Sequence, residues 1–282
     1  MRGENHSLMA QSAAMVRAAH QLLDDPPVFA DRLALAMIGE EARATLRSAP
    51  EKFQTPGSRH IRAFMAARSR CAEDELASAI KRGAKQYVVL GAGLDTYVYR
   101  NPSPTPRVFE VDYPATQAWK RERLEAAGIS IPSSVVFVPV DFEKMSLSSA
   151  LECAGFEPQQ ITFFSWLGVT PYLPSETAMA TLTFIASMPS GSGVVFDYAV
   201  ARASLNPVEQ IAQDVLARRV ARGGEPFQLF FEPEALAAML RGVGFQEIED
   251  LGPIEIDARY FRDRADGLRV SAGLAHVLRA RI

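Results

Sequence analysis

From Gln86 to about residue 199, short apolar runs alternate with amphipathic stretches along the chain. The runs are YVVLG (87–91), RVFEVD (107–112), VVFVPVD (135–141), ITFFSW (161–166) and GVVFDYA (193–199). Strands that are continuously apolar and rich in Val, Ile and Phe are typical of a parallel sheet covered on both faces. Between the runs, residues 115–128 and 175–188 have helical spacing. The pattern therefore predicts a doubly wound α/β fold.

Residues 1–84 carry a different pattern, with apolar positions three and four apart. This spacing predicts helices over 28–46 and 60–83, and Gly83 is a suitable C-terminal stop for the second. We therefore expect a helical N-terminal cap over residues 1–84, followed by an α/β core over residues 85–282.

The C-terminal part of the chain adds elements and interrupts the alternation. Residues 231–252 predict a helix ended by glycine and then a strand, and residues 268–280 predict a last strand. Residues 200–231 hold a helix and a glycine hinge, RGGEP. An insertion after a sheet strand lies at the carboxyl edge, where ligands bind, so we expect this segment to be a lid.

Composition excludes several classes of protein. The chain has 282 residues, 48% of them hydrophobic, and a formal charge of −3 without a basic run, which argues against disorder and against nucleic-acid partners. No apolar stretch reaches the roughly 18 residues that span a bilayer, and the start lacks the apolar core of a signal peptide. Cys71 and Cys153 lie far apart with no metal-like spacing. We expect a cytoplasmic protein with no membrane partner and no metal; the sequence does not indicate an oligomeric state.

The glycine turn LGAGLD follows the first apolar run. Gly91 and Gly93 suit a tight strand-to-helix turn where backbone passes close to a ligand, although a plain loop remains the alternative. The turn lacks the third glycine of a dinucleotide fingerprint, and Asp95 follows it directly. An acid at a helix start repels a pyrophosphate, so a ligand with a positive group fits better.

Acids close the next two predicted strands. Glu110 and Asp112 end one strand, and a carboxylate there can accept both hydroxyls of a ribose. Asp141 and Phe142 end the next, where an acid can accept the adenine amine and an aromatic ring can stack on the base. Each acid alone is also compatible with a helix cap or a solvated loop. Together with the glycine turn, a ribose, an adenine and a positive centre without phosphates describe S-adenosylmethionine.

At these residues the chain resembles the leucine carboxyl methyltransferase family, in particular its bacterial branch of S-adenosylmethionine-dependent methyltransferases. The matching stretches are MAARSR, VVLGAGLDTYVYR, VFEVDYPATQAWK, VPVDFE and FFSWLGVTPYLP, in that order over residues 65–174. The N-terminal SAAMVRAAHQLLDDPPVFADRLA is also similar to the branch. The resemblance implies a class I (Rossmann-like) methyltransferase sheet of seven strands, mostly parallel with the last antiparallel, and S-adenosyl-L-methionine as cofactor.

The resemblance also implies a role for each matching position at the cofactor. Arg68 matches the arginine that pairs with the cofactor carboxylate; without the match it would be taken for an exposed helix arginine. Gly91, and by adjacency Gly93, matches the cofactor turn. Asp112 matches the ribose acid, with Glu110 its neighbour in the strand.

Asp141 and Phe142 match the adenine pair. Tyr172 matches a tyrosine near the methyl acceptor, with a packing role as the alternative. Two departures concern the substrate of the eukaryotic, phosphatase-methylating members. Leu167 stands where they have glutamate, and Glu143 stands where they have the arginine that holds the substrate carboxylate. A negative group there would repel a peptide carboxylate, which argues against a phosphatase tail as substrate.

The histidines bear on the acceptor. None of His6, His20, His60 and His276 follows a predicted sheet strand at the carboxyl edge, which favours a carboxylate or an acidic phenol as the acceptor. Aromatic residues of the lid and of the loop after residue 166 would line an apolar pocket or belong to the core. These candidates are Trp166, Tyr172, Tyr198, Phe227, Phe230 and Phe231.

Three functions remain open from the sequence. The first is an S-adenosylmethionine-dependent O-methyltransferase acting on the carboxyl group of a hydrophobic small molecule, or on a phenol or other hydroxyl of a natural product. The second is a nicotinamide-dependent oxidoreductase on the same sheet, against which Asp95 and the missing glycine argue. The third is a cofactor-binding protein without catalysis.

Overall fold

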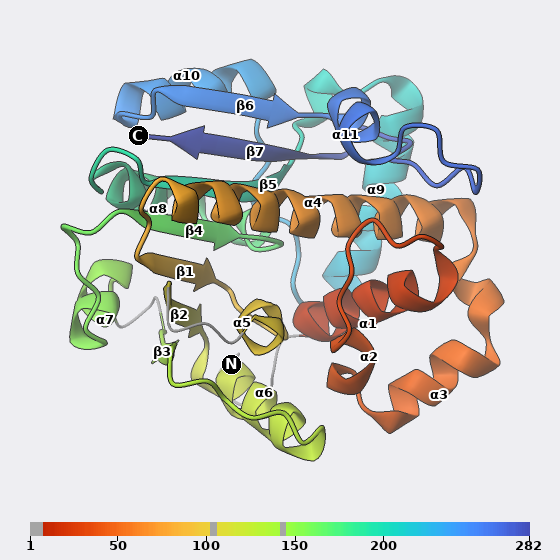
Figure 1. Ribbon diagram of the computed structural model, residues 1–282. Coiled ribbons are helices and arrows are strands. Elements are labelled where there is room, and N and C mark those ends of the chain that lie inside the picture. The colour runs from red at the N-terminus through yellow and green to blue at the C-terminus, as the bar shows by residue number, and fades with distance from the viewer. Residues whose placement is uncertain (1–7, 102–105, 142–144) are drawn as a thin grey trace.

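A seven-stranded sheet between layers of helices forms the centre of the molecule (Figure 1). The computed structural model describes residues 8–101, 106–141 and 145–282. The strand order is β3-β2-β1-β4-β5-β7-β6, and β7 runs antiparallel to both of its neighbours. The strands are β1 Gln86–Leu90, β2 Arg107–Asp112, β3 Val135–Pro139, β4 Thr162–Trp166, β5 Gly193–Ala199, β6 Glu247–Leu251 and β7 Ala275–Arg281. The predicted fold class is confirmed.

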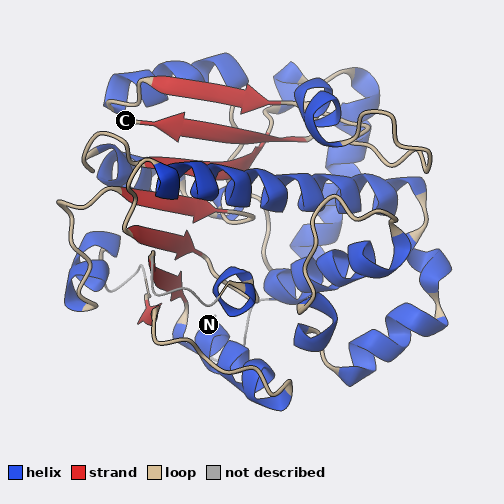
Figure 2. Cartoon of the chain, in the orientation of Figure 1, coloured by secondary structure: helices blue, strands red, loops and turns tan. Residues whose placement is uncertain are grey.

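Helices cover both faces of this sheet, as Figure 2 shows. In Figure 1, α4 crosses one face, while α8 and α10 lie behind the other, and α1 to α3 lie past the carboxyl ends of the parallel strands. The α-helices are α1 Leu8–Leu23, α2 Ala34–Met37, α3 Glu40–Ser48, α4 Pro56–Lys81, α5 Tyr97–Arg100, α6 Pro114–Ala126, α7 Leu147–Cys153, α8 Ser175–Ala186, α9 Pro207–Arg222, α10 Pro233–Val243 and α11 Pro253–Tyr260. Short 3-10 turns are η1 Pro50–Phe53, η2 Thr170–Tyr172 and η3 Arg202–Ser204.

Observed and predicted elements differ in a few places. The helix predicted over 28–46 is broken at Gly39, which has a φ of +81° and lies against the Arg123 guanidinium, so that α2 and α3 form instead. The strand predicted over 268–280 begins only at Ala275. The strand predicted over 135–141 ends at Pro139.

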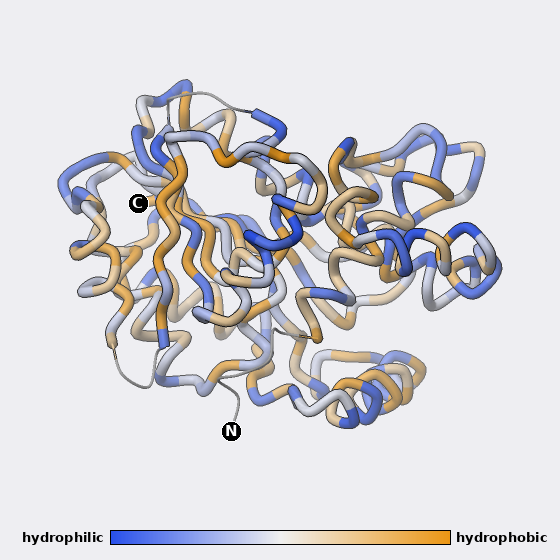
Figure 3. Tube along the Cα trace, turned by 90° about the horizontal axis from the view of Figure 1, so that it is seen from below, coloured by the Kyte–Doolittle hydropathy of each residue, from blue (hydrophilic) through white to orange (hydrophobic). Residues whose placement is uncertain are grey.

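Two apolar clusters fill the space on either side of the sheet. Val89 of β1 packs in one with α1 and α4, while Val88 and Leu90 pack in the other with α8 and α10. This alternation is the pattern of a sheet buried on both faces. Figure 3 shows apolar chain concentrated in the central strands and hydrophilic stretches toward the periphery.

Helix α4 connects the N-terminal helices to the sheet. It begins at a Thr55 cap, whose hydroxyl accepts a hydrogen bond from the Ser58 amide, and runs for 26 residues to Lys81. It contacts α1 and also β4 and β5. Side chains near its middle therefore lie beside the sheet.

No helix in the described part of the chain is both long and apolar enough to cross a membrane. Cys71 is buried and Cys153 is exposed, and both are free thiols.

Candidate cofactor and acceptor site

Positions 91 and 93 in the turn between β1 and α5 favour glycine. Gly91 has a φ of +66°, and a Cβ on it would lie 2.3 Å from Cγ2 of Val169. Gly93 has a φ of +44°, and its Cβ would lie 3.2 Å from Cβ of Ala10. Backbone at positive φ favours glycine, and here the loop after β4 and helix α1 also fill the space. Two other segments of the chain therefore contact the turn, while Gly91 itself stays exposed.

Asp112 lies at the carboxyl end of β2 and faces the same turn. Its Oδ2 accepts a hydrogen bond from the Gly93 amide at 2.6 Å, and its Oδ1 accepts one from the Tyr113 amide at 2.7 Å. Burial raises the pKa of this carboxyl group, and the bond from the Gly93 amide opposes the rise. An ionised carboxylate has about four acceptor positions, so hydroxyl groups of a ligand can still bind.

Glu110 lies on the same face of β2 but is fully buried. Its Oε2 lies 2.8 Å from Nζ of Lys120, and the Tyr99 hydroxyl donates to the same oxygen at 3.1 Å. The residue is 1% exposed, so its carboxylate offers no surface to a ligand. Glu110 positions the end of β2 through Lys120, and this leaves Asp112 as the acid that faces the turn.

The other two predicted acids, Asp95 and Asp141, follow strands β1 and β3. Asp95 is half-buried, and its Oδ1 accepts from the Tyr97 amide at 2.9 Å, which orders the start of α5. Asp141 is half-buried just beyond β3, where the Val140 amide donates to the Asp112 carbonyl oxygen. Phe142, the predicted adenine partner, lies outside the described residues.

Arg68 points from α4 to an acid that the sequence reasoning missed. Its Nη1 lies 2.6 Å from Oδ2 of Asp197 on β5, and the Arg68 and Asp197 side chains are 11% and 5% exposed. Oδ1 of Asp197 accepts a hydrogen bond from the Gly168 amide at 2.6 Å. Nε of Arg68 is buried with no hydrogen-bond partner. An acid inside the apolar run GVVFDYA was the available signal, because buried acids are rare unless paired.

Tyr172 lies in η2, close to this ion pair. The Thr170 hydroxyl donates to the Asp197 carbonyl oxygen at 2.6 Å, which fixes the loop. The Tyr172 ring lies 5.4 Å from that of Phe227, and Nε2 of Gln228 donates to the Tyr172 carbonyl oxygen at 2.6 Å. Burial raises the pKa of the Tyr172 phenol to about 12, with Arg68 opposing the rise. The loop after β4 thus contacts the segment that follows α9.

Helix α1 contacts the glycine turn through polar side chains. Arg17 donates to the Leu94 carbonyl oxygen and lies 3.0 Å from Oδ2 of Asp31. Asp31 in turn accepts from the Thr96 hydroxyl at 2.7 Å. The N-terminal helices therefore close one side of the turn.

One expectation about histidines is wrong. Because β7 is antiparallel, its first residues lie at the carboxyl edge, where His276 pairs in register with Tyr198 of β5. Nδ1 of His276 lies 2.7 Å from Oδ2 of Asp250, and the Tyr198 hydroxyl donates to Oδ1 of Asp250 at 3.0 Å. His20 is buried and accepts from the Val28 amide at 3.0 Å, so it joins α1 to the segment that follows that helix.

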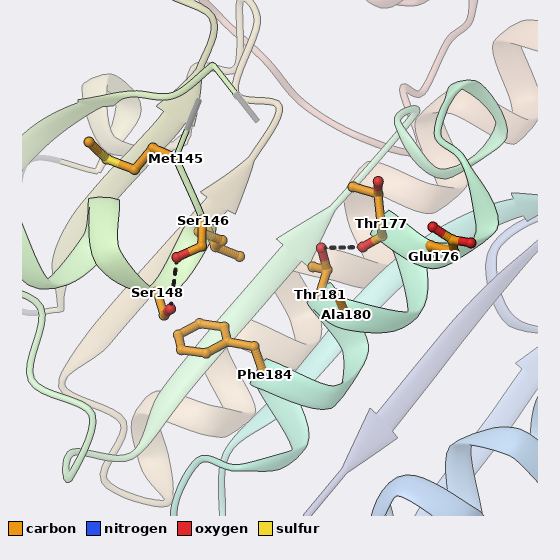
Figure 4. Close-up of a pocket in the computed structure, with 9 residues that line it drawn as sticks. Met145, Ser146, Ser148, Glu176, Thr177, Ala180, Thr181 and Phe184 are labelled. Carbon is orange, nitrogen blue, oxygen red and sulfur yellow. Dashed lines mark hydrogen bonds between the residues drawn. The ribbon is translucent and has the colours of Figure 1, made fainter. Parts of the chain in front are cut away.

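A hollow of about 430 Å³ opens elsewhere, between the start of α7 and one side of α8 (Figure 4). Ser146, Ser148, Thr177 and Phe184 are among its lining residues. None of the residues at the Arg68–Asp197 pair lines it, so we do not place the acceptor there.

The strand order, with β7 antiparallel, is that of a class I methyltransferase sheet. The leucine carboxyl methyltransferase model matches residues 10–186, and the chain belongs to that family. YktD of Bacillus subtilis, named as a candidate S-adenosyl-L-methionine-dependent methyltransferase, is 33% identical over 95% of each chain. A similarly named Mycobacterium marinum protein is 30% identical over 78% of this chain and 71% of its own. A candidate methyltransferase structure from Thermobifida fusca has the same fold, with a TM-score of 0.60 at 16% identity, covering 99% of this chain and 96% of its own.

The protein is thus an S-adenosyl-L-methionine-dependent methyltransferase, and the oxidoreductase alternative is set aside. The residues present fit this cofactor. The Gly91 backbone is exposed, Asp112 keeps acceptor positions, and the buried Nε of Arg68 lacks a partner that a carboxylate would supply.

Proposed function

We propose that this methyltransferase O-methylates the carboxyl group of a hydrophobic small molecule. The observation that supports it is the aromatic contact of Tyr172 with Phe227, beside the Arg68–Asp197 pair. Phe230 extends this group, with its ring 6.0 Å from that of Phe227. Aromatic side chains beside a few polar groups are typical of pockets for small apolar ligands.

The cofactor roles of individual residues belong to the same proposal. Arg68 binds the cofactor carboxylate, Gly91 and Gly93 let backbone approach it, and Asp112 accepts from the ribose. Asp141, with Phe142, holds the adenine. When bound, S-adenosyl-L-methionine supplies a methyl group activated by its sulfonium.

The protein's own groups then orient the acceptor and exclude water. A carboxylate is ionised at neutral pH and needs positioning rather than a base. The Tyr172 phenol, with its pKa raised to about 12, stays protonated and can donate a hydrogen bond to that carboxylate. In our proposal the insertion at 200–231 is the lid, the helices before residue 85 are the cap, and the free thiols fit the cytoplasm.

The substrate departs from that of the phosphatase-methylating members. Leu167 and Glu143 replace a glutamate and an arginine at positions that matter for a peptide carboxylate, and Glu143 adds a negative charge. These residues argue against a protein C-terminus as substrate.

A second candidate acceptor is a phenol or other hydroxyl, and His276 is the observation that favours it. The Asp250–His276 contact orients an imidazole at the carboxyl edge, and such a pair can remove a proton from a hydroxyl. His276 accordingly separates the two chemistries.

The test is incubation with methyl-labelled cofactor and an extract of the source organism, followed by alkaline treatment of the labelled product. A methyl ester loses its label in base, whereas a methyl ether keeps it. Base-stable label that depends on His276 would overturn the carboxyl proposal in favour of the hydroxyl one. Cofactor binding without label transfer to any of a broad set of acids and phenols would indicate a binding protein without catalysis.

A further inference from the structure

The Asp197 carboxylate binds two different segments that border the site. Oδ2 lies 2.6 Å from Nη1 of Arg68 on α4, and Oδ1 accepts from the Gly168 amide in the loop after β4. The Asp197 carbonyl oxygen accepts from the Thr170 hydroxyl, two residues before Tyr172. One residue of β5 therefore joins α4 to the loop that carries Tyr172.

These contacts fix the direction of the Arg68 guanidinium. A Cβ on Gly168, which has a φ of +72°, would lie 2.9 Å from Nη2 of Arg68, so the guanidinium packs on bare backbone. With Nη1 held by Asp197, the rigid fork presents its remaining N–H groups in one direction. Among these, Nε is buried and unpaired. A buried N–H without a partner costs free energy that an accepting ligand would recover.

On the basis of the proposed cofactor role of Arg68, we propose that Asp197 is a positioning residue that directs Arg68 to the amino-acid end of the cofactor. It also couples that contact to the acceptor loop. The residues proposed for the nucleoside end, Asp112 and the glycine turn, are held in place by separate hydrogen bonds within the protein. Loss of the Asp197 charge should therefore weaken binding of the amino-acid end of the cofactor and leave binding of the nucleoside end unchanged.

Two ligands distinguish binding at the amino-acid end of the cofactor from binding at its nucleoside end. S-adenosylhomocysteine has both, whereas 5′-methylthioadenosine has the same thioether nucleoside without the amino acid. Calorimetric titration compares wild type with Asp197→Asn, which keeps an oxygen for the Gly168 amide but removes the charge from Arg68. We expect affinity for S-adenosylhomocysteine to fall about 30-fold or more, the lower end of the cost of breaking a buried charged pair, with affinity for methylthioadenosine unchanged.

The matched control is Asp74→Asn, which removes the partner of Arg70 on the same helix at a half-exposed site. It should change neither affinity. Equal losses for both probes in Asp197→Asn, or no loss for either, would overturn the positioning role. If Asp197→Asn does not fold, Gly168→Ala displaces the guanidinium without removing a charge and must show the same selective loss.

The variant Arg68→Gln tests the proposed cofactor role of Arg68 separately from the positioning role of Asp197. Unchanged S-adenosylhomocysteine affinity in Arg68→Gln means that Arg68 does not bind the cofactor, and the cofactor assignment of Arg68 fails. A loss in Arg68→Gln together with wild-type affinities in Asp197→Asn overturns the role of Asp197 alone.

Discussion

Gly91 shows how one position can depend on two separate constraints. Its φ of +66° disfavours any side chain, and Val169 occupies the place of its Cβ. Gly128 has nearly the same φ, +67°, but nothing lies within 4 Å of its Cβ position. The two glycines together separate backbone strain from steric contact.

Gly91→Ala should lower affinity for S-adenosylhomocysteine at least about tenfold. We expect it to cost about 1–3 kcal/mol more unfolding free energy than Gly128→Ala, because a methyl group is forced into packed atoms. Gly128→Ala should cost only the backbone strain, about 1–2 kcal/mol, and leave binding unchanged. Calorimetric titration measures the affinity for S-adenosylhomocysteine, and urea unfolding measures the unfolding free energy of each variant. Equal losses in the two variants would show that the Val169 contact is unimportant.

Asp112 gives a prediction for pH. Burial raises the pKa of this carboxyl group above its ordinary value of 3.8, which means that folding favours the protonated form. The stabilisation is therefore present below pH 3.8 and is lost as the pH rises through the raised pKa. The ribose hydroxyls need the ionised form as acceptor. Affinity for 5′-methylthioadenosine should therefore rise with pH through this window.

In Asp112→Asn the affinity should be about tenfold or more lower, and this rise should be absent. Titrations over the acidic range test it, with the half-exposed Asp214→Asn as a control that keeps the rise. A wild-type pH profile in Asp112→Asn would assign the ribose contact elsewhere.

Among the elements, α1 and α4 are joined by a buried polar group. Nε and Nη2 of Arg62 each donate to Asp24 at 2.8 Å, and Nδ1 of His20 lies 2.8 Å from the same carboxylate. Burial would raise the pKa of Asp24, but the hydrogen bonds from Arg62 and His20 outweigh it and lower the pKa to about 2. The contribution of this carboxylate is therefore present above pH 3.8 and is lost as pH falls toward 2.

Asp24→Asn should lower the free energy of unfolding by about 3–5 kcal/mol near neutral pH, because it leaves the Arg62 cation buried and unpaired. The deficit relative to wild type should shrink as the pH falls toward 2. Urea unfolding at a series of pH values measures it, and Asp214→Asn at its exposed pair should cost less than about 1 kcal/mol. If the difference in unfolding free energy between Asp24→Asn and wild type stayed constant with pH, the lowered pKa of Asp24 would not be its cause.

The contact between η2 and the segment after α9 carries a prediction about the acceptor. Phe227→Ala removes the ring beside Tyr172 and should raise KM for an apolar acceptor about tenfold, the effect of losing most of a buried aromatic contact. Affinity for S-adenosylhomocysteine should stay within about twofold. Steady-state kinetics test this, with Ile254→Ala on exposed α11 as the control. A change in cofactor affinity with an unchanged KM would place Phe227 at the cofactor.

At the scale of the whole molecule, the central strands were predictable because β1, β4 and β5 are buried on both faces and read as continuous apolar runs. The break at Gly39 was not, since the Arg123 side chain that lies there comes from a distant helix. The glycine turn and Asp112 were found because the turn follows one strand and Asp112 ends the next. Asp197 and His276 were missed: one lies inside a strand, and the other begins an antiparallel strand whose place is set by sheet order alone.

Arg68 and Asp197 are 129 residues apart along the chain. During synthesis α4 emerges long before β5, so its guanidinium stays hydrated until the sheet has been assembled past β4. Because the ligand favours the assembled state by mass action, it should slow the breakdown of molecules newly released from the ribosome. In a cell, the supply of cofactor would then influence how much of this enzyme accumulates.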